Sequence, residues 1–151
     1  MSNFDSQEAH THFGKSCYNG TWGYIDSENR SEAETEAMLH TAHASFWHWQ
    51  QVEARTAQND SIGYWQLSRV YALAKRWPEA MYYAQRCVKV SDAAELDPFF
   101  RGYGYEALAR AHKGAGQKDE ASTQCATAIA LAEQVSDAES KAMLMADIKS
   151  L

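Results

Sequence analysis

Apolar and small side chains recur along this chain every three or four residues, which is the spacing of one face of an α-helix. The pattern is clearest at Ala80, Ala84 and Cys87, and again at Ala121 and Cys125. No segment has a convincing strand pattern. The sequence therefore predicts an all-α protein of about seven helices, at residues 5–26, 31–54, 61–76, 78–92, 98–114, 117–134 and 137–150.

Residues that favour helix starts support these boundaries. Ser31 with Glu34, and Ser136 with Glu139, have the spacing of a capping box. In that motif the hydroxyl and the carboxylate each accept a hydrogen bond from an otherwise unpaired amide of the first turn. Further helix starts are indicated by Asn59-Asp60-Ser61, by Pro78 and by Asp97-Pro98. The predicted first helix is less regular, because each internal glycine costs about 1 kcal/mol relative to alanine.

One stretch of the sequence occurs twice, 41 residues apart. The first copy contains Gly63-Tyr64, Leu67, Arg69 and Glu79-Ala80, and the second contains Gly104-Tyr105, Leu108, Arg110 and Glu120-Ala121. A repeat that spans two predicted helices indicates an array of stacked helix pairs.

Both copies resemble the tetratricopeptide repeat (TPR), a helix-turn-helix unit with aromatic, leucine, small and tyrosine positions on its first helix and a Glu-Ala pair opening its second. The matching residues are Tyr64, Leu67, Ser68, Tyr71 and Glu79-Ala80, then Tyr105, Leu108, Ala109, His112 and Glu120-Ala121. The resemblance covers residues 61–134. It implies a right-handed superhelical stack of antiparallel helix pairs, that is, a TPR-like α-α solenoid.

The chain also departs from the TPR pattern. Its period is 41 residues where the family has 34, which we attribute to a longer join between Ser91 and Pro98. The large aromatic residue of the second helix is replaced by Ala84 and Cys125, so we expect atypical stacking. A single domain then spans 1–151, with a degenerate first helix pair at 1–56, repeats at 61–92 and 98–134, and a capping helix at 136–151.

A second, broader resemblance rests on histidines and aromatic residues. It is carried by His40, His43-Ala44-Ser45 and His48-Trp49, together with the segments 65–71 and 105–111. These are similar to a group of small, uncharacterised bacterial proteins of TPR type. The resemblance implies a helical fold and a cytoplasmic location, with no established activity.

Composition narrows the class of partner. The chain has a net charge of −6 and a pI of about 5.5, without a local cluster of Lys and Arg, which argues against nucleic acid. The N-terminal sequence lacks a secretory leader, and no apolar run is long enough for a membrane span. We therefore expect a cytoplasmic protein. Its three cysteines lack a C-x-x-C pair and are expected to be reduced thiols in the core.

The TPR resemblance also predicts a binding surface. In TPR arrays the first helix of each unit lines a concave face, where extended peptides or partner helices usually bind. By that resemblance the partner-binding residues are Trp65, Arg69, Leu73, Tyr103, Glu106, Arg110 and Lys113. A guanidinium suits carboxylates, so Arg69 and Arg110 are candidates to hold an acidic or C-terminal peptide segment. The alternative is that each arginine pairs with a neighbouring glutamate such as Glu106 and ties the units together.

Four histidines make up an alternative ligand site: His40, His43, His48 and His112. His40 and His43 are about 60° apart on a helix, but His48 points about 140° away from His43. No H-E-x-x-H motif or cysteine partner accompanies them, so the local geometry is poor for a metal. We expect these histidines to be mostly structural groups hydrogen-bonded between helices.

The sequence favours a non-enzymatic protein-protein interaction module over an enzyme. No glycine-flanked serine elbow and no phosphate-binding loop occurs, and we expect no cofactor. The partner is a peptide, a helix or a second copy of the chain. Self-association is included because Trp47, Trp77, Tyr82 and Tyr83 exceed what a 17.0 kDa core should need. The alternative is a helical protein that binds a small molecule or a metal through the histidines.

Overall fold

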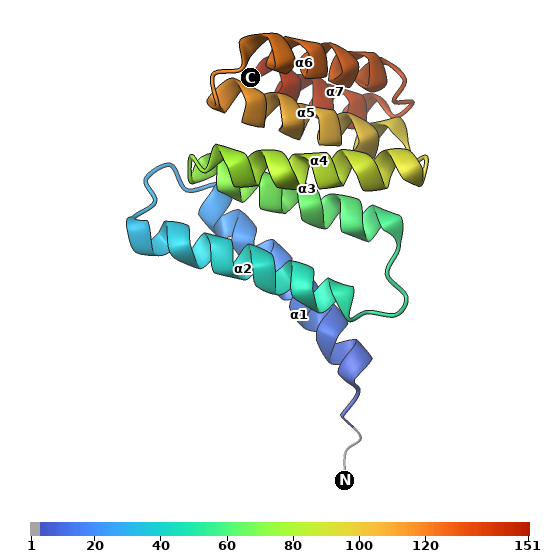
Figure 1. The fold of residues 1–151 in the computed structure, drawn as a ribbon. Helices are drawn as coiled ribbons and strands as arrows, with labels where there is room; N and C mark the ends of the chain where they lie inside the picture. The colour runs from blue at the N-terminus through green and yellow to red at the C-terminus, as the bar shows by residue number, and fades with distance from the viewer. Residues whose placement is uncertain (1–3) are drawn as a thin grey trace.

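The computed structural model describes residues 4–151, and α-helices are the regular secondary structure of that part of the chain (Figure 1). The seven helices are α1 (Ser6–Ile25), α2 (Glu32–Gln50), α3 (Ala57–Leu73), α4 (Trp77–Ala93), α5 (Pro98–Gly114), α6 (Lys118–Glu133) and α7 (Ala138–Lys149). The predicted all-α class and number of helices are therefore confirmed for these residues. The first three residues of the predicted 1–56 unit lie outside the described part.

Two of the predicted helix starts are confirmed in atomic detail. The Ser31 hydroxyl accepts a hydrogen bond from the Glu34 amide at 3.1 Å, and the Glu34 carboxylate accepts one from the Ser31 amide at 2.7 Å. Asp97 caps α5 by accepting from the Phe99 amide at 2.9 Å, and Pro98 is the first residue of that helix. Both arrangements satisfy amides that the helix itself leaves unpaired.

Two other starts differ from the prediction. Helix α3 begins at Ala57, because Thr56 and Asn59 form the capping box and Asn59 lies inside the helix. Helix α7 is capped by Asp137, whose carboxylate accepts from the Ser140 amide at 2.8 Å. The expected box at 136 and 139 is therefore wrong by one position, since an aspartate that follows the serine is an equally good cap.

The turn after the first helix of each repeat uses the same left-handed position. Lys75 follows α3 with φ 57°, and Gly116 follows α5 with φ 80°. In both copies the next amide donates to a carbonyl of the last helical turn at 2.9 Å, which is the Schellman arrangement. Glycine adopts this conformation freely, whereas a lysine is strained there.

The extra length of the repeat lies in its helices. Helix α4 continues past Ser91 to Ala93, and the Ser91 hydroxyl donates to the Cys87 carbonyl within the helix at 2.6 Å. The join to α5 is consequently short. The expectation of a longer join from Ser91 onward is wrong, because Ser91 is fully buried on the apolar face of α4.

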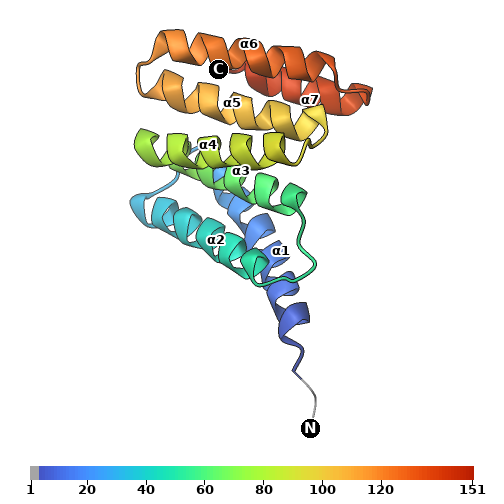
Figure 2. The same cartoon turned by 45° about the vertical axis from the view of Figure 1, so that its right-hand side comes forward.

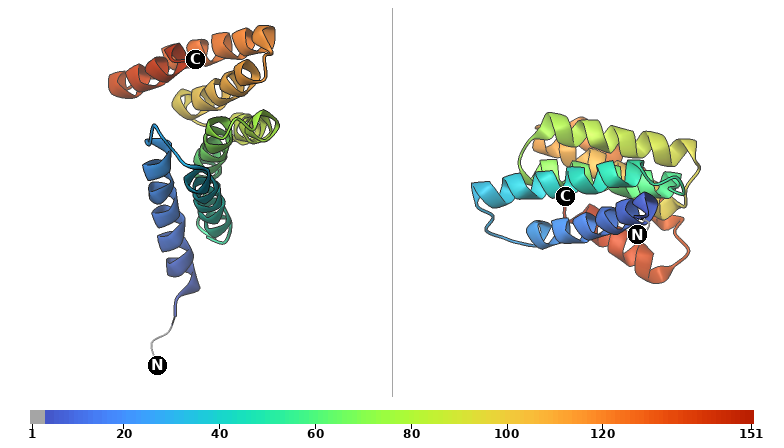
Figure 3. Two further views of the ribbon diagram at one scale, coloured as in Figure 1. Left: turned by 90° about the vertical axis from the view of Figure 1, so that its left-hand side faces the viewer. Right: turned by 90° about the horizontal axis from the view of Figure 1, so that it is seen from below.

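The helices pack mainly against their neighbours in sequence. Helices α1 and α2, α3 and α4, and α5 and α6 form antiparallel pairs, and α4 also packs extensively against α5 (Figures 1 and 2). Helix α7 packs against α5 and α6. Seen from the side, α1 and α7 lie on one side of the stack and α4 and α6 on the other (Figure 3, left).

The repeated apolar residues form the core between these helices. Leu67 and Leu108, and the equivalent Ala80 and Ala121, are all buried. Small residues allow close approach elsewhere as well: a Cβ added at Gly14 of α1 would lie 3.0 Å from the Trp49 ring of α2. That contact explains why a glycine interrupts the first helix.

Candidate functional site

The candidate site is an aromatic-lined pocket of about 270 Å³ between α1, α3, α5 and α7. Six of the residues that line it are aromatic: Tyr18, Trp22, Trp65, Phe99, Phe100 and Tyr103. Met143 and Asp147 of α7 close one side. The first helices of both repeats therefore supply the pocket together with the first and last helices of the chain.

The aromatic rings of the pocket contact one another in defined orientations. The rings of Trp22 and Trp65 stack with centroids 5.8 Å apart and an interplanar angle of 23°. Trp65 also meets Tyr103 edge to face at 5.6 Å. These are favourable aromatic geometries, so the walls are held in place without a ligand.

A buried carboxylate accepts a hydrogen bond from the indole of Trp65. Glu106 is fully buried, and its Oε2 accepts a hydrogen bond from Trp65 Nε1 at 3.2 Å. Its other oxygen pairs with Arg110 on the next turn of α5. Trp65 and Glu106 occupy equivalent positions of the two repeats, so this hydrogen bond also ties the repeats together. Of the two roles considered for Arg110, the structure therefore contains the ion pair with Glu106.

Arg69 differs from its repeat equivalent Arg110. Its guanidinium forms no hydrogen bond or ion pair with residues 4–151, and none of its nitrogens is sealed from solvent. The Nε of Arg110, in contrast, is the buried side-chain polar atom of the described chain that lacks a partner. Burial, and then the Arg110 charge, lower the pKa of Arg69. An arginine remains charged at neutral pH nonetheless, so Arg69 is a cation without a bonded counter-ion in the described part of the chain, one helical turn from the pocket residue Trp65.

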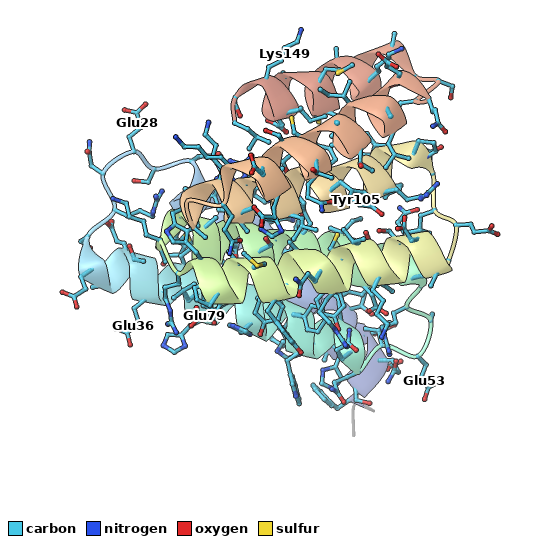
Figure 4. The ribbon with its side chains drawn as sticks, turned by 45° about the horizontal axis from the view of Figure 1, so that its top comes forward. Glu28, Glu36, Glu53, Glu79, Tyr105 and Lys149 are labelled. Carbon is cyan, nitrogen blue, oxygen red and sulfur yellow. The ribbon has the colours of Figure 1, made fainter. Side chains whose placement is uncertain are left out.

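Arg69 and the charges around it together carry one positive charge in excess. Besides Arg110, its pKa is affected by Glu106, Asp147 and Arg30, which makes three guanidinium groups against two carboxylates. Arg30 caps the C-terminal end of α1 by donating to the Tyr24 carbonyl at 3.0 Å. Other acidic residues of the chain are exposed on its surface. Figure 4 shows three of them pointing outward: Glu28, Glu36 and Glu53.

Asp147 brings a carboxylate to the opposite wall. Its Oδ2 accepts a hydrogen bond from the Tyr103 hydroxyl at 2.6 Å. Burial and this bond raise the pKa of Tyr103, so the phenol stays protonated and donates. The Oδ1 atom of Asp147 has no hydrogen-bond partner within the described chain and is available to a ligand.

Five of the seven residues predicted for the concave face lie together in this region. They are Trp65, Arg69, Tyr103, Glu106 and Arg110. The other two lie apart from them. Leu73 packs against the core of α1, α2 and α3. Lys113 is exposed at the end of α5 and donates to the main-chain oxygen of Leu151.

The four histidines of the alternative site are not brought together. His40 is exposed and lies 3.5 Å from Glu36 on the same helix. The Nε2 of His43 is 2.8 Å from the Tyr71 hydroxyl, and burial lowers the pKa of His43. His112 contacts Gln117 at 2.6 Å beyond the end of α5.

His48 instead pairs with a histidine of the first helix. Its Nδ1 lies 2.9 Å from Nδ1 of His10. Between residues 4 and 151, no three His, Cys, Asp or Glu side chains are grouped so that they could hold a metal. Each histidine thus has a separate local partner.

Sequence reasoning missed the walls that come from the ends of the chain. Tyr18 and Trp22 of α1, and Met143 and Asp147 of α7, line the pocket but belong to neither repeat copy. The available signal was their spacing, since residues four apart share a helix face. Nothing in that spacing indicates that the two faces meet around Trp65.

A second hollow of about 610 Å³ lies between α5 and α6. It is lined by three alanines together with Lys113, Lys118, Ser122, Cys125, Ile129 and Leu151. It contains no aromatic side chain, and no acidic side chain accompanies Lys113 and Lys118 among its lining residues, so it offers less to orient a ligand. The aromatic pocket is therefore the better candidate.

Comparison of the chain with protein-family models, with curated proteins and with solved structures found no match. Within residues 4–151, no helix combines the length and the apolar character that crossing a bilayer would require.

Proposed function

We propose that this chain is a TPR-like α-α solenoid that acts as a non-enzymatic interaction module. Its helix pairs form a right-handed superhelical stack, and the side lined by α1, α3, α5 and α7 receives a peptide or a partner helix. The observation that carries this proposal is the open aromatic pocket with the unpaired Arg69 beside it.

The composition of the site favours binding of a protein segment. Tryptophan, tyrosine and arginine are the residues that dominate binding energy at protein interfaces. Here Trp22, Trp65 and Tyr103 line space that the core leaves unfilled, and Arg69 follows Trp65 by one turn of α3. A large apolar side chain of the partner would enter the pocket and bury aromatic surface.

The charge of the site favours an acidic partner. The positive excess around Arg69 lies in a chain of net charge −6, so it is a local feature and no consequence of overall composition. A carboxylate of the partner would neutralise the guanidinium with charge-assisted hydrogen bonds.

The chemistry at the site favours binding over catalysis. The thiol on the pocket wall, Cys87, is buried, and burial raises its pKa to about 12. Such a thiol holds almost no reactive thiolate at neutral pH. Glu106 is already committed to Trp65 and Arg110. A cofactor-free, cytoplasmic binding protein accounts for these residues.

A second copy of the chain is the other partner that this proposal includes. Trp47 and Phe13 are 57% and 47% exposed on α2 and α1, while Tyr82 is 54% exposed on α4. Apolar side chains at these positions suit an interface between two copies. Light scattering coupled to size-exclusion chromatography distinguishes a dimer from a monomer of 17.0 kDa.

Selection of peptides from a random displayed library tests the interaction module. Affinities of the enriched peptides are then measured by fluorescence anisotropy for the wild type and for variants. Met143→Trp should obstruct the pocket, since Met143 lines it yet is 54% exposed and tolerates a larger side chain. Ala142→Trp, one position away on the exposed surface of α7, is the matched control.

We expect Met143→Trp and Arg69→Gln each to weaken binding by about tenfold or more, in line with the loss of a charged hydrogen bond or a filled pocket. Ala142→Trp should leave the affinity unchanged. The proposal is wrong if no peptide is enriched, or if the enriched peptides bind all three variants as tightly as the wild type.

A further inference from the structure

We propose that the aromatic pocket binds a free aromatic α-amino acid. The ring would lie among Trp22, Trp65 and Tyr103, the α-carboxylate would pair with Arg69, and the α-ammonium would pair with Asp147. The ligand would occupy the pocket that the proposed function assigns to a partner side chain, but its binding requires no protein partner.

The size and lining of the pocket suit one aromatic ring. Its volume of about 270 Å³ is at the lower limit of the roughly 300–1,000 Å³ typical of ligand pockets. Trp22 and Trp65 stack on each other and Tyr103 meets Trp65 edge to face, so these rings form a fixed aromatic lining that a planar ring can contact.

Arg69 is placed to bind a carboxylate. It lies one helical turn beyond Trp65 on the same face of α3, since residues four apart are neighbours on a helix surface. No described residue neutralises it, and its nitrogens reach solvent. A guanidinium offers a planar fork of donors that matches both oxygens of a carboxylate.

Asp147 supplies the opposite charge on the facing helix. It lines the pocket, and the Tyr103 hydroxyl occupies only its Oδ2. Its charge acts on Arg69, which follows the pocket residue Trp65 by one turn of α3. An α-amino acid carries its ammonium and carboxylate on one carbon beside the ring, which matches this pair of opposite charges next to an aromatic pocket.

The remaining charges leave these two positions to the ligand. Glu106 is fully buried and bound by Trp65 and Arg110. Arg30 is held by three carbonyls at the end of α1. Neither group can turn into the pocket without losing its present partners. If the pocket holds an amino acid, a partner side chain cannot enter it, so the metabolite would compete with the partner.

Isothermal titration with three related probes tests this inference on the full chain. L-phenylalanine carries both charges, 3-phenylpropionate lacks the ammonium, and phenethylamine lacks the carboxylate. We expect L-phenylalanine to bind with a Kd of about 1 mM or tighter, the range expected for a ligand of this size. Each of the other two probes should bind about tenfold or more weakly, because one buried charge then has no counterpart.

Variants assign each charge to its residue. Arg69→Gln should weaken L-phenylalanine and 3-phenylpropionate by about 10- to 100-fold and leave phenethylamine unchanged. Asp147→Asn should weaken L-phenylalanine and phenethylamine and leave 3-phenylpropionate unchanged. Met143→Trp should reduce binding of all three probes, whereas the matched Ala142→Trp should not. Circular dichroism melts verify that each variant is folded.

Three results would overturn the inference. They are no heat of binding for L-phenylalanine at millimolar concentrations, equal affinity for L-phenylalanine and 3-phenylpropionate, and unchanged L-phenylalanine binding by Met143→Trp. Each concerns a free amino acid alone. Peptides that bind the pocket while L-phenylalanine does not would support the proposed function and reject this inference. Binding of L-phenylalanine without binding of any peptide would support this inference and reject the proposed function.

Discussion

Removing the charge of Glu106 is the sharpest test of how the site is built. Glu106 is 0% exposed, while the side chain of its partner Arg110 is 18% exposed. The substitution Glu106→Gln keeps an oxygen that can accept from Trp65 Nε1, which lies 3.2 Å from the carboxylate in the native protein. It removes the negative charge that pairs with Arg110. The perturbation therefore acts mainly on the charge pair.

The expected cost follows from the burial of that pair. Breaking a buried ion pair by removing one partner typically costs about 3–5 kcal/mol, because the other charge remains buried. Arg110 retains some contact with solvent, so we expect the lower end, about 3 kcal/mol. In a chain of 151 residues this corresponds to a fall of roughly 6–12 °C in Tm.

Urea unfolding followed by tryptophan fluorescence measures this change, with the m-value verifying that the transition is unaltered. The double variant Glu106→Gln/Arg110→Met should recover about half of the loss or more, because it also removes the unpaired charge. Glu79→Gln is the matched control. It breaks the ion pair with Arg76, which lies on the surface with side chains 54% and 35% exposed, and should leave the unfolding midpoint unchanged. A Glu106→Gln variant as stable as Glu79→Gln would refute the reasoning.

Three further predictions concern packing, backbone strain and reactivity. Gly114→Ala should destabilise the protein by about 1–3 kcal/mol, since the new Cβ would lie 2.3 Å from the rigid Trp77 ring. A Cβ added at Gly20 meets nothing within 4 Å, so Gly20→Ala should instead stabilise α1 by up to about 1 kcal/mol. Thermal melts of both variants test this comparison. A lower melting temperature for Gly20→Ala would contradict it. Lys75→Gly should raise the free energy of unfolding by about 1 kcal/mol, because glycine adopts the left-handed conformation at φ 57° without strain. A lower free energy of unfolding in urea would show that contacts of the lysine side chain outweigh the backbone strain. Cys87 should not react with a thiol reagent at pH 8 until the chain unfolds, because burial raises its pKa to about 12; the thiolate becomes common only as the pH rises toward that value, so rapid labelling of Cys87 in the native state would contradict this account.

Local signals in the sequence predicted the helices well. Apolar spacing and capping residues act within one or two turns, so the Ser31 box and the Asp97-Pro98 start could be recognised without tertiary information. The same is true of the 41-residue repeat, which placed Arg69 and Arg110 at equivalent positions. The start of α3 was misjudged because Asn59 is a good N-cap by itself, while here it serves as the second partner of a Thr56 box.

The repeat alone also could not tell the two arginines apart. By sequence they are equivalent, yet Arg110 has a glutamate one turn before it, whereas the corresponding position before Arg69 is Trp65. That difference leaves Arg110 paired and Arg69 unpaired. It is readable from the sequence once one knows that Trp65 and Glu106 contact each other across the repeats.

The sequence by itself determined the helical class, most helix boundaries and the repeat that makes Trp65 equivalent to Glu106 and Arg69 equivalent to Arg110. The tertiary structure decided that α1 and α7, from opposite ends of the chain, meet α3 and α5 around Trp65 and Tyr103 and form a pocket with them. The physical reason is range. Capping and helical periodicity depend on neighbours within a few residues, whereas the meeting of Trp22, Trp65 and Asp147 depends on how all the intervening helices pack.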